Sequence, residues 1–306
     1  MRGSRSDAFR SGPILGVALF VLLLCGATEA QSLKDRLVQL TNEQFQLVQQ
    51  RALHGERNSM AMMALAYDEG VHVQRDDAQA AAWYRKLALV HDYQAQHQLA
   101  LFYAQGRGVP QSDTEAIRWY RKAAELGYLP SQVNLGNMYL SGRGVPPNYE
   151  EAAKWYQVAA QQGDAQAQND IGYLYDVGHG VAQDDGQAAY WYRRSAEQGY
   201  GTAMNNLGVM YLHGRGVAFD ESEALRWFDR AIAVGKAKGY TNKALVYMYG
   251  VRTRHDYPLA SRLLQQASAA GDAVEADPLL HKCQEELGKP HGDKAEQALN
   301  AQSIRH

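Results

Sequence analysis

Cysteine is scarce in this chain of 306 residues, which contains only Cys25 and Cys283. Cys25 lies in an N-terminal segment that we expect to be removed, so the remaining chain would hold one thiol and no internal disulfide. We therefore expect packing alone to hold the fold together. Cys283 is expected to be a buried, inert thiol, and the alternative is a link between two chains.

An excess of charge of either sign is also lacking. The chain has 31 Lys and Arg against 33 Asp and Glu, which gives a formal net charge of -2. Proteins that bind nucleic acids need concentrated basic residues to neutralise phosphate groups. We therefore expect no nucleic-acid partner.

The main apolar run is too short to span a membrane. Residues 14–27 carry no charge, but a spanning helix needs roughly 20 apolar residues. This run follows a stretch with three arginines and precedes Ala30, which is the pattern of a secretory signal. We predict a signal peptide over residues 1–30, cleaved after Ala30, and a periplasmic or secreted protein. The alternative is an uncleaved N-terminal helix that anchors the chain, and only then would a membrane be a partner.

The chain is rich in internal repetition with a period of 36 residues. Tryptophan, tyrosine, glycine and alanine each recur in one shared register. The tryptophan column comprises Trp83, Trp119, Trp155, Trp191 and Trp227, and one glycine column comprises Gly70, Gly106, Gly142, Gly178, Gly214 and Gly250. Chance does not produce several such columns in one register, so the chain is built from structural repeats.

Each repeat has the signals of two helices, which we name helix A and helix B. In the third repeat Asn148 and Glu151 have the spacing of a capping box, which predicts that helix B begins at about Tyr149. Gly163 is expected to end helix B near Gln162, and the next helix A would run from about Asp164 to Gly178. The tryptophans lie on the apolar stripe of helix B, so we expect them in the core rather than stacked on a ligand.

A Gly-x-Gly-Val loop follows each complete helix A, as in Gly142–Val145. Such glycines could cradle a phosphate, but a phosphate loop follows a strand and leads into a helix. Here the glycines follow a helix, and the motif recurs at Gly106–Val109, Gly178–Val181 and Gly214–Val217. We therefore predict that the loop only turns the chain.

These patterns predict an all-α fold, a solenoid of about six 36-residue helix-turn-helix repeats. The predicted organisation is a signal peptide over residues 1–30, an N-terminal capping helix within 31–59, the repeats over 60–272, and a C-terminal capping helix with a polar tail over 273–306. We expect the leading helix over residues 32–54 and the closing helix over residues 276–288.

The segment LGNMYLSGRGVPPNYEEAAKWYQVAAQQGDAQAQ, residues 135–168, resembles a Sel1-like repeat, which is a tetratricopeptide-like helical hairpin. The resemblance covers about residues 60–272. It implies a right-handed α-solenoid that presents surfaces to other proteins. Bacterial members are often exported and act as adaptors, and some cysteine-rich relatives are described as β-lactamases. This chain lacks their paired cysteines.

Sequence patterns that carry catalysis were not found. The chain has no Ser-x-x-Lys and no His-Glu-x-x-His motif, and its ten histidines are scattered. We therefore predict a protein that is not an enzyme, with no catalytic residue, no metal site and no cofactor. Two alternatives stay open: a periplasmic enzyme such as a β-lactam-binding or hydrolysing protein, and a membrane-tethered structural component of the envelope.

Function is expected where the repeats differ, because the shared residues build the solenoid. In such stacks the A helices line the concave surface. Amide side chains there could bond the backbone of an extended peptide, so we predict a scaffold that binds a protein or peptide through this face. The alternative is a solvated face without a ligand. The candidate partner-binding residues are Gln98, Asn134, Asn169, Asp170, Tyr173, Asn205 and Asn206.

Overall fold

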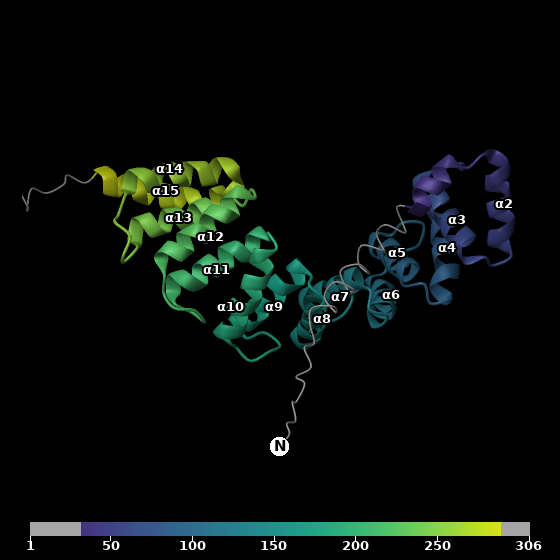
Figure 1. Cartoon of the computed structure of the whole chain (residues 1–306), viewed down its shortest axis with the longest axis horizontal. Coiled ribbons are helices and arrows are strands. Elements are labelled where there is room, and N and C mark those ends of the chain that lie inside the picture. The colour runs from purple at the N-terminus through teal and green to yellow at the C-terminus, as the bar shows by residue number, and fades with distance from the viewer. Residues whose placement is uncertain (1–31, 289–306) are drawn as a thin grey trace, which may run out of the picture. The chain divides into compact units, whose positions relative to one another are not determined.

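A computed structural model describes residues 32–288, and every regular element of this part is a helix (Figure 1). The predicted signal peptide and the polar tail beyond Gly288 lie outside the described residues. A helical segment over residues 32–39 comes first. The helices that follow are α2 (Asn42–Leu53), α3 (Arg57–Glu69), α4 (Asp77–Leu89), α5 (Tyr93–Gln105), α6 (Asp113–Glu125), α7 (Leu129–Ser141), α8 (Tyr149–Gln161), α9 (Ala165–Val177), α10 (Asp185–Glu197), α11 (Gly201–His213), α12 (Glu221–Ala233), α13 (Lys238–Tyr249), α14 (Tyr257–Ala267), the π-helical turn η1 (Ser268–Asp272) and α15 (Ala273–Gly288).

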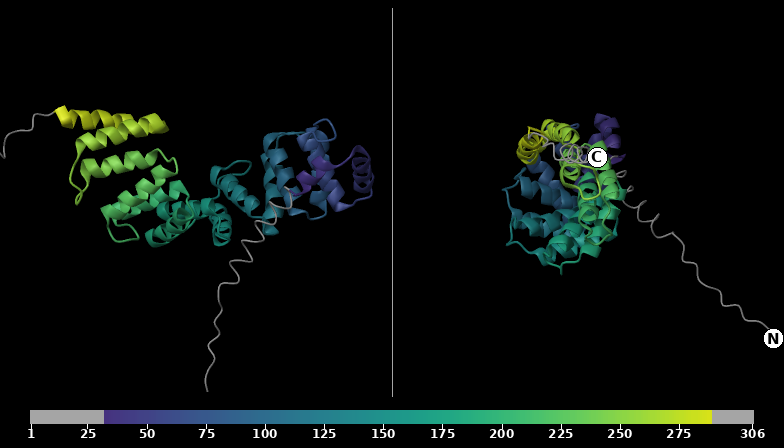
Figure 2. Two further views of the ribbon diagram at one scale, coloured as in Figure 1. Left: turned by 45° about the horizontal axis from the view of Figure 1, so that its top comes forward. Right: turned by 90° about the vertical axis from the view of Figure 1, so that its left-hand side faces the viewer.

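The helices form two compact units, the first ending at Gln162 and the second beginning at Gly163. Within the first unit each helix from α2 to α8 packs against the next, and the same holds from α9 to α15 in the second unit. Figure 2 shows this order within each unit from two further directions. The predicted all-α solenoid of helical hairpins is confirmed.

Helices A are α3, α5, α7, α9, α11 and α13, and each packs against the helix B that follows it. The core alternates small and large side chains. A Cβ added at Gly172 of α9 would lie 2.9 Å from the ring of Tyr192 on α10, and one at Gly208 of α11 would lie 2.4 Å from the ring of Phe228 on α12. Glycine therefore lets an aromatic ring lie directly on the backbone of helix A.

Helix ends follow the predicted local signals closely. Asn148 precedes α8, and its side chain accepts a hydrogen bond from the Glu151 backbone N–H at 3.0 Å. The expected return bond of the capping box differs, because the Glu151 carboxylate pairs with Lys154 at 2.8 Å. Gly163 adopts a φ of 101°, and Gly178 ends α9 with a φ of 72°. Local capping chemistry therefore sets these boundaries.

The tryptophan column lies in the core, as predicted. Four of the five tryptophans are buried and Trp155 is half-buried. A cation lies over four of the rings, from the residue three positions later in the same helix. These pairs are Lys86 over Trp83, Lys122 over Trp119, Arg194 over Trp191 and Arg230 over Trp227. The rings thus fill the interior, and flexible cationic side chains cover their outer edges.

The preceding helix B lies directly against the second loop glycine at Gly108, Gly144 and Gly216. Gly108 has a φ of 62°, and a Cβ there would lie 2.1 Å from the carbonyl oxygen of Asp77. The equivalent Cβ at Gly216 would lie 2.0 Å from the carbonyl oxygen of Asp185. The loop therefore joins neighbouring repeats by close backbone packing. The described residues contain no strand that could lead into a phosphate cradle.

The ends of the array depart from the repeat. His72 stands where the four central repeats have glycine, and His91 stands where all later repeats have it. Both adopt a positive φ, of 62° and 60°. Gly250 keeps its place in the glycine column, but its φ is -60°. The leading segment forms two helices, residues 32–39 and α2, where the sequence favoured one, because Thr41 caps a new helix.

The closing helix α15 begins at Ala273, three residues earlier than expected. Cys283 lies in this helix and is fully buried against α13 and α14. Its thiol donates a hydrogen bond to the Tyr257 carbonyl oxygen at 3.2 Å, and burial raises the pKa of the thiol. A buried thiol with a raised pKa is a poor nucleophile, as expected for an inert cysteine.

Candidate interaction surface

In the first unit, two of the predicted binding residues lie half-buried on A helices. Gln98 is on α5 and lines a groove, while Asn134 is on α7 and hydrogen-bonds the Tyr120 hydroxyl. Burial raises the pKa of Tyr120 to about 12, and the bond from Asn134 partly opposes this shift. Asn134 therefore has a partner within the fold, and Gln98 faces the groove.

In the second unit, predicted residues of α9 and α11 are joined by hydrogen bonds. The Asn206 amide donates to Asn169 at 3.1 Å, and the Asn169 amide donates to Asp170 at 3.0 Å. Burial raises the pKa of Asp170, although its bonds from Asn169 and Gln166 oppose the shift. This chain of side chains ties α9 to α11, so part of its hydrogen-bonding capacity is already used.

Exposure separates the candidate residues further. Asn169 and Asn205 are each only 6 % exposed, so little of either side chain can reach a partner. The expectation that they bond a peptide directly is thereby weakened, because each points into the packing between neighbouring repeats. Tyr173 is 45 % exposed and accessible on α9. Gln98, Asn134, Asp170 and Asn206 are half-buried and remain candidates with Tyr173.

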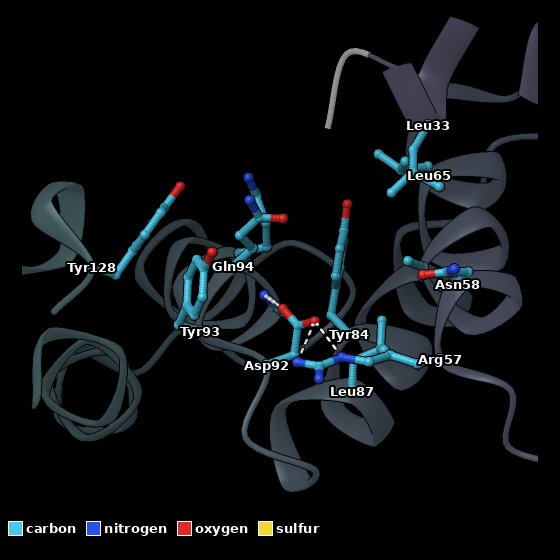
Figure 3. A pocket seen from close by; sticks show the side chains of 13 residues that line it. Leu33, Arg57, Asn58, Leu65, Tyr84, Leu87, Asp92, Tyr93, Gln94 and Tyr128 are labelled. Atoms are coloured by element: carbon cyan, nitrogen blue, oxygen red, sulfur yellow. Dashed lines mark hydrogen bonds and ion pairs between the residues drawn. The ribbon is translucent and has the colours of Figure 1, made fainter. Parts of the chain in front are cut away.

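The first unit carries a groove of about 480 Å³ over its A helices (Figure 3). Tyr93 and Tyr128 lie at one side with ring centroids 5.2 Å apart, and Leu33 and Leu65 lie at the other. The remaining lining residues are Arg57, Asn58, Ala61, Tyr84, Leu87, Asp92, Gln94, Ala95 and Gln98. Apolar, aromatic and amide groups thus meet in one hollow, as in many ligand sites.

The groove exists because Ala61 is small. One repeat later the same position holds His97, which is buried and contacts Ser131 and the rings of Tyr120 and Tyr128. His97 therefore fills, between α5 and α7, the space that stays open beside Ala61 on α3. The signal was present in the sequence, as an alanine in a column of larger residues.

An ion pair borders the groove. Both Nε and Nη2 of Arg57 lie 3.0 Å from Asp92 Oδ2, and Asp92 also caps α5 through the Ala95 N–H. The Arg57 side chain is 55 % exposed, so it keeps donor groups available to a partner. The rim is therefore polar and close to neutral, beside an apolar floor.

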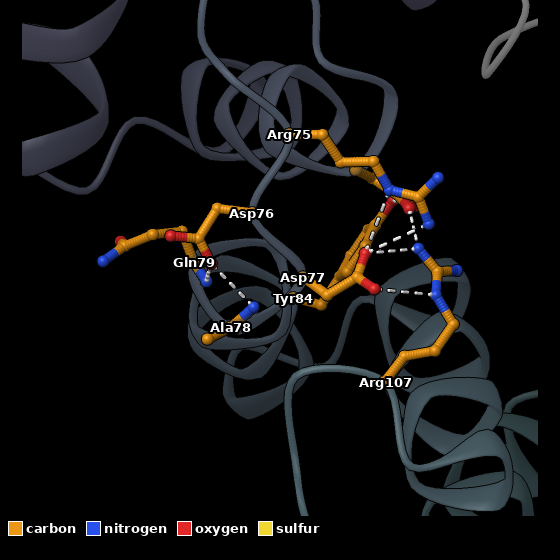
Figure 4. A network of polar contacts seen from close by, with 8 residues as sticks. Arg75, Asp76, Asp77, Ala78, Gln79, Tyr84 and Arg107 are labelled. Carbon is orange, nitrogen blue, oxygen red and sulfur yellow. Dashed lines mark hydrogen bonds and ion pairs between the residues drawn. The ribbon is translucent and has the colours of Figure 1, made fainter.

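A second polar cluster fixes one wall of the groove (Figure 4). Tyr84 donates its hydroxyl proton to Asp68 at 3.2 Å, and Arg107 bonds Asp68 at 2.6 Å and Asp77 at 2.7 Å. The Arg107 hydrogen bond holds the pKa of Asp77 below its usual value. Burial raises the pKa of Tyr84. Because every charge here has a partner, the cluster orients Tyr84 and ties the repeats together.

The same arrangement recurs in the second unit. Arg215 pairs with Asp176 at 2.5 Å, and Tyr192 donates to Asp176 at 3.4 Å. Recurrence identifies the cluster as part of the repeat rather than as a catalytic acid and base. Among residues 32–288, no group of three or more His, Cys, Asp or Glu residues is placed to hold a metal ion.

Comparison with known families agrees with this architecture. The Sel1 repeat model matches residues 58–89, 94–128, 129–164, 165–200, 201–236 and 239–272, which is more than half of the chain. The chain belongs to the Sel1 repeat family. Proteins of Sel1 repeats are typically protein-interaction scaffolds, and their solenoid fold is generally non-catalytic.

Two solved structures resemble this Sel1 repeat protein over most of its length. The protective antigen c5321 of uropathogenic Escherichia coli, which displays an SLR fold, is 32 % identical with a TM-score of 0.70; the match covers 83 % of this chain and 53 % of that one. A Sel1 repeat protein from Oxalobacter formigenes is 28 % identical with a TM-score of 0.60, covering 83 % and 95 %. This chain thus spans about half the length of the E. coli protein. A search of curated proteins gave no match.

Among residues 32–288 of this Sel1 repeat protein, no helix combines the length and the apolar character that crossing a bilayer requires.

Proposed function

We propose that this Sel1 repeat protein is an exported, non-catalytic scaffold of the cell envelope that binds a protein or peptide partner through its A helices. The groove beside Ala61 is the observation that carries the proposal. It is open, it lies on A helices, and it combines an apolar floor with amide and tyrosine groups. Export rests on the N-terminal signal pattern of residues 1–30.

The lining chemistry suits an extended peptide. Leu65 and Leu87 can receive an apolar side chain, and the amide of Gln98 can bond a peptide backbone without demanding one sequence. Tyrosine supplies contact area at low conformational cost. The exposed part of Arg57 adds donors at the rim.

The test is to fill the groove. Ala61→His places at this position the residue that the next repeat already carries as His97, so the fold is expected to tolerate it. Peptides selected from a displayed random library on the purified full chain should bind Ala61→His about tenfold more weakly, which corresponds to about 1.4 kcal/mol. Affinity is measured by fluorescence polarisation.

Val158→Lys is the matched control. Val158 is 40 % exposed on helix B, and the other repeats carry Lys86, Lys122, Arg194 and Arg230 at this position. Val158→Lys should bind the selected peptides with the same affinity as the unaltered chain. Equal binding by Ala61→His, or a library that yields no binder, would overturn the proposal for this groove.

A further inference from the structure

In the third repeat, a buried glutamine on helix A makes two hydrogen bonds with its side-chain amide. The Gln132 amide donates to the Ala124 carbonyl oxygen at 3.3 Å, and Gln132 Oε1 accepts from the Gln162 amide at 2.7 Å. In the second unit, Gln168 Oε1 accepts from Gln198 at 2.8 Å. The donor is thus the residue 30 positions later, where helix B ends.

Gln96 makes only the first of these two bonds. Its amide donates to the Ala88 carbonyl oxygen at 3.1 Å, but the residue 30 positions later is Leu126, which has no side-chain donor. Gln96 is 1 % exposed, and its Oε1 has no hydrogen-bond partner among the described residues. A buried acceptor without a donor is unfavourable, so this oxygen is a site where a donor would be bound.

Gln96 is one of the residues that line a cavity of about 200 Å³. The side chains around it include His91, Lys122, Glu125 and Leu126. One water occupies about 30 Å³, so the cavity has room for a side chain. None of the residues that line it lines the groove beside Ala61, so the two sites are separate surfaces of the first unit.

Two apolar residues that line this cavity are exposed, Leu89 at 64 % and Leu126 at 50 %. Val90, which follows Leu89 in the chain, is 51 % exposed. The equivalent positions are polar in the third and fourth repeats, as Gln161, Gln162, Glu197 and Gln198, and apolar again in the fifth, as Ala233 and Val234. The first unit therefore has an apolar edge at the place where the glutamine donor is missing, and exposed apolar clusters of this kind mark interaction sites.

We propose that the cavity beside Gln96 is a docking site for a partner protein that inserts an asparagine or glutamine side chain set among apolar residues. The inserted amide N–H donates to Gln96 Oε1, as Gln162 donates to Gln132. The neighbouring apolar side chains of the partner cover Leu89 and Leu126. Lys122 and Glu125 lie at the rim, where charges of both signs can orient the partner.

Two variants copied from other repeats test the site. Leu126→Gln supplies the donor internally, as Gln162 and Gln198 do, and should raise the melting temperature while closing the site. Gln96→Met removes the acceptor, and the chain already pairs Met204 with Val234 at the equivalent positions. Leu126→Gln reproduces the glutamine pair of the third and fourth repeats, and Gln96→Met gives an apolar pair similar to Met204 with Val234.

The probe is a displayed library of helix-forming peptides, selected on the full chain and counter-selected on Leu126→Gln. Enriched peptides should carry an Asn or Gln flanked by apolar residues and should bind Leu126→Gln at least about tenfold more weakly. Replacing that Asn or Gln by Leu should weaken binding to the unaltered chain but not to Gln96→Met.

Three results would overturn the proposal. Enriched peptides could lack an amide residue, they could bind Leu126→Gln as tightly as the unaltered chain, or the exchange for Leu could weaken binding equally on Gln96→Met. In each case Gln96 Oε1 is not the group that the partner recognises. If Leu126→Gln lowers the melting temperature, this variant is not used to judge the proposal. The effect of the Leu exchange in the peptide, compared between the unaltered chain and Gln96→Met, then decides it.

Discussion

Ala61 and His97 occupy the same position of neighbouring repeats, yet one leaves a groove and the other fills the equivalent space. His97 is 7 % exposed, its ring contacts Tyr120 and Tyr128, and its Nδ1 lies 2.9 Å from Ser131 Oγ. Burial lowers the pKa of His97 to about 4 from an ordinary value of 6.5. The residue that closes this part of the surface is therefore held neutral at physiological pH.

The buried His97 makes stability depend on pH. Between pH 6.5 and 4 the unfolded chain binds a proton at this residue and the folded chain does not, so stability falls as the pH falls through this range. We expect His97 to account for a loss of up to about 3 kcal/mol. His97→Asn, which copies Asn169 and Asn205, should reduce the loss, as measured by urea unfolding at pH 7 and pH 4.

The exposed His281 provides the control for this measurement. Its side chain is 78 % exposed, so His281→Asn makes the same exchange outside the core. Parallel curves for His97→Asn and the unaltered chain would show that His97 does not carry the effect.

At the scale of elements, the loops that contain Gly108, Gly144 and Gly216 hold a repeat to the one before it within the same unit. Gly108, in the loop after α5, packs against the first turn of α4. The adjacent Arg107 pairs with Asp77 of that turn. A glycine with positive φ in open surroundings, such as Gly127, has no such contact among the described residues. Gly108 and Gly127 both need a left-handed backbone, but only Gly108 also needs the absence of a side chain. The packing around each glycine makes this difference.

Alanine substitutions at Gly127 and Gly108 should differ in how much stability they remove. Gly127→Ala adds only the cost of a left-handed backbone, about 1 kcal/mol. Gly108→Ala adds the same cost and a Cβ 2.1 Å from the Asp77 carbonyl oxygen, so we expect a further loss of about 1–3 kcal/mol. Urea unfolding of both variants measures the difference, and equal losses would contradict the close contact at Gly108.

At the scale of the whole molecule, repetition builds the frame and departures from it create the candidate sites. Each unit stacks its helices so that every helical hairpin buries its apolar stripe against neighbours. The groove and the Gln96 cavity both lie in the first unit, at positions where Ala61 and Leu126 replace larger or polar residues. In such a chain we therefore expect the binding sites at positions where one repeat differs from the others.

Export concerns the whole chain, and the N-terminal sequence predicts it. Expressed in a Gram-negative bacterium, the protein should be recovered from the periplasm or the medium with Gln31 as its first residue, because a signal peptidase cuts after small residues such as Ala30. N-terminal sequencing of the purified protein gives the answer. A membrane fraction that retains Met1 would support the anchored alternative instead.

Local signals let the sequence by itself determine the repeat, its helix boundaries and its tryptophan core. Asn148, Gly163 and Gly178 act within one turn of their own helices, so their effect can be deduced without knowing what packs nearby. The same reasoning explains why the family was recognisable from the sequence. Gln98 was predicted by a different argument, from its place at a position of helix A that varies between repeats.

Only the tertiary structure decided which polar residues are available and where the surface is hollow. Asn169 and Asn205 have amide side chains that could bond a peptide, yet packing between repeats buries both. The groove brings Leu33 together with Tyr128, and the unpartnered state of Gln96 depends on Leu126. These features arise from contacts between side chains 30 or more residues apart, which no local pattern specifies because burial depends on every neighbour at once.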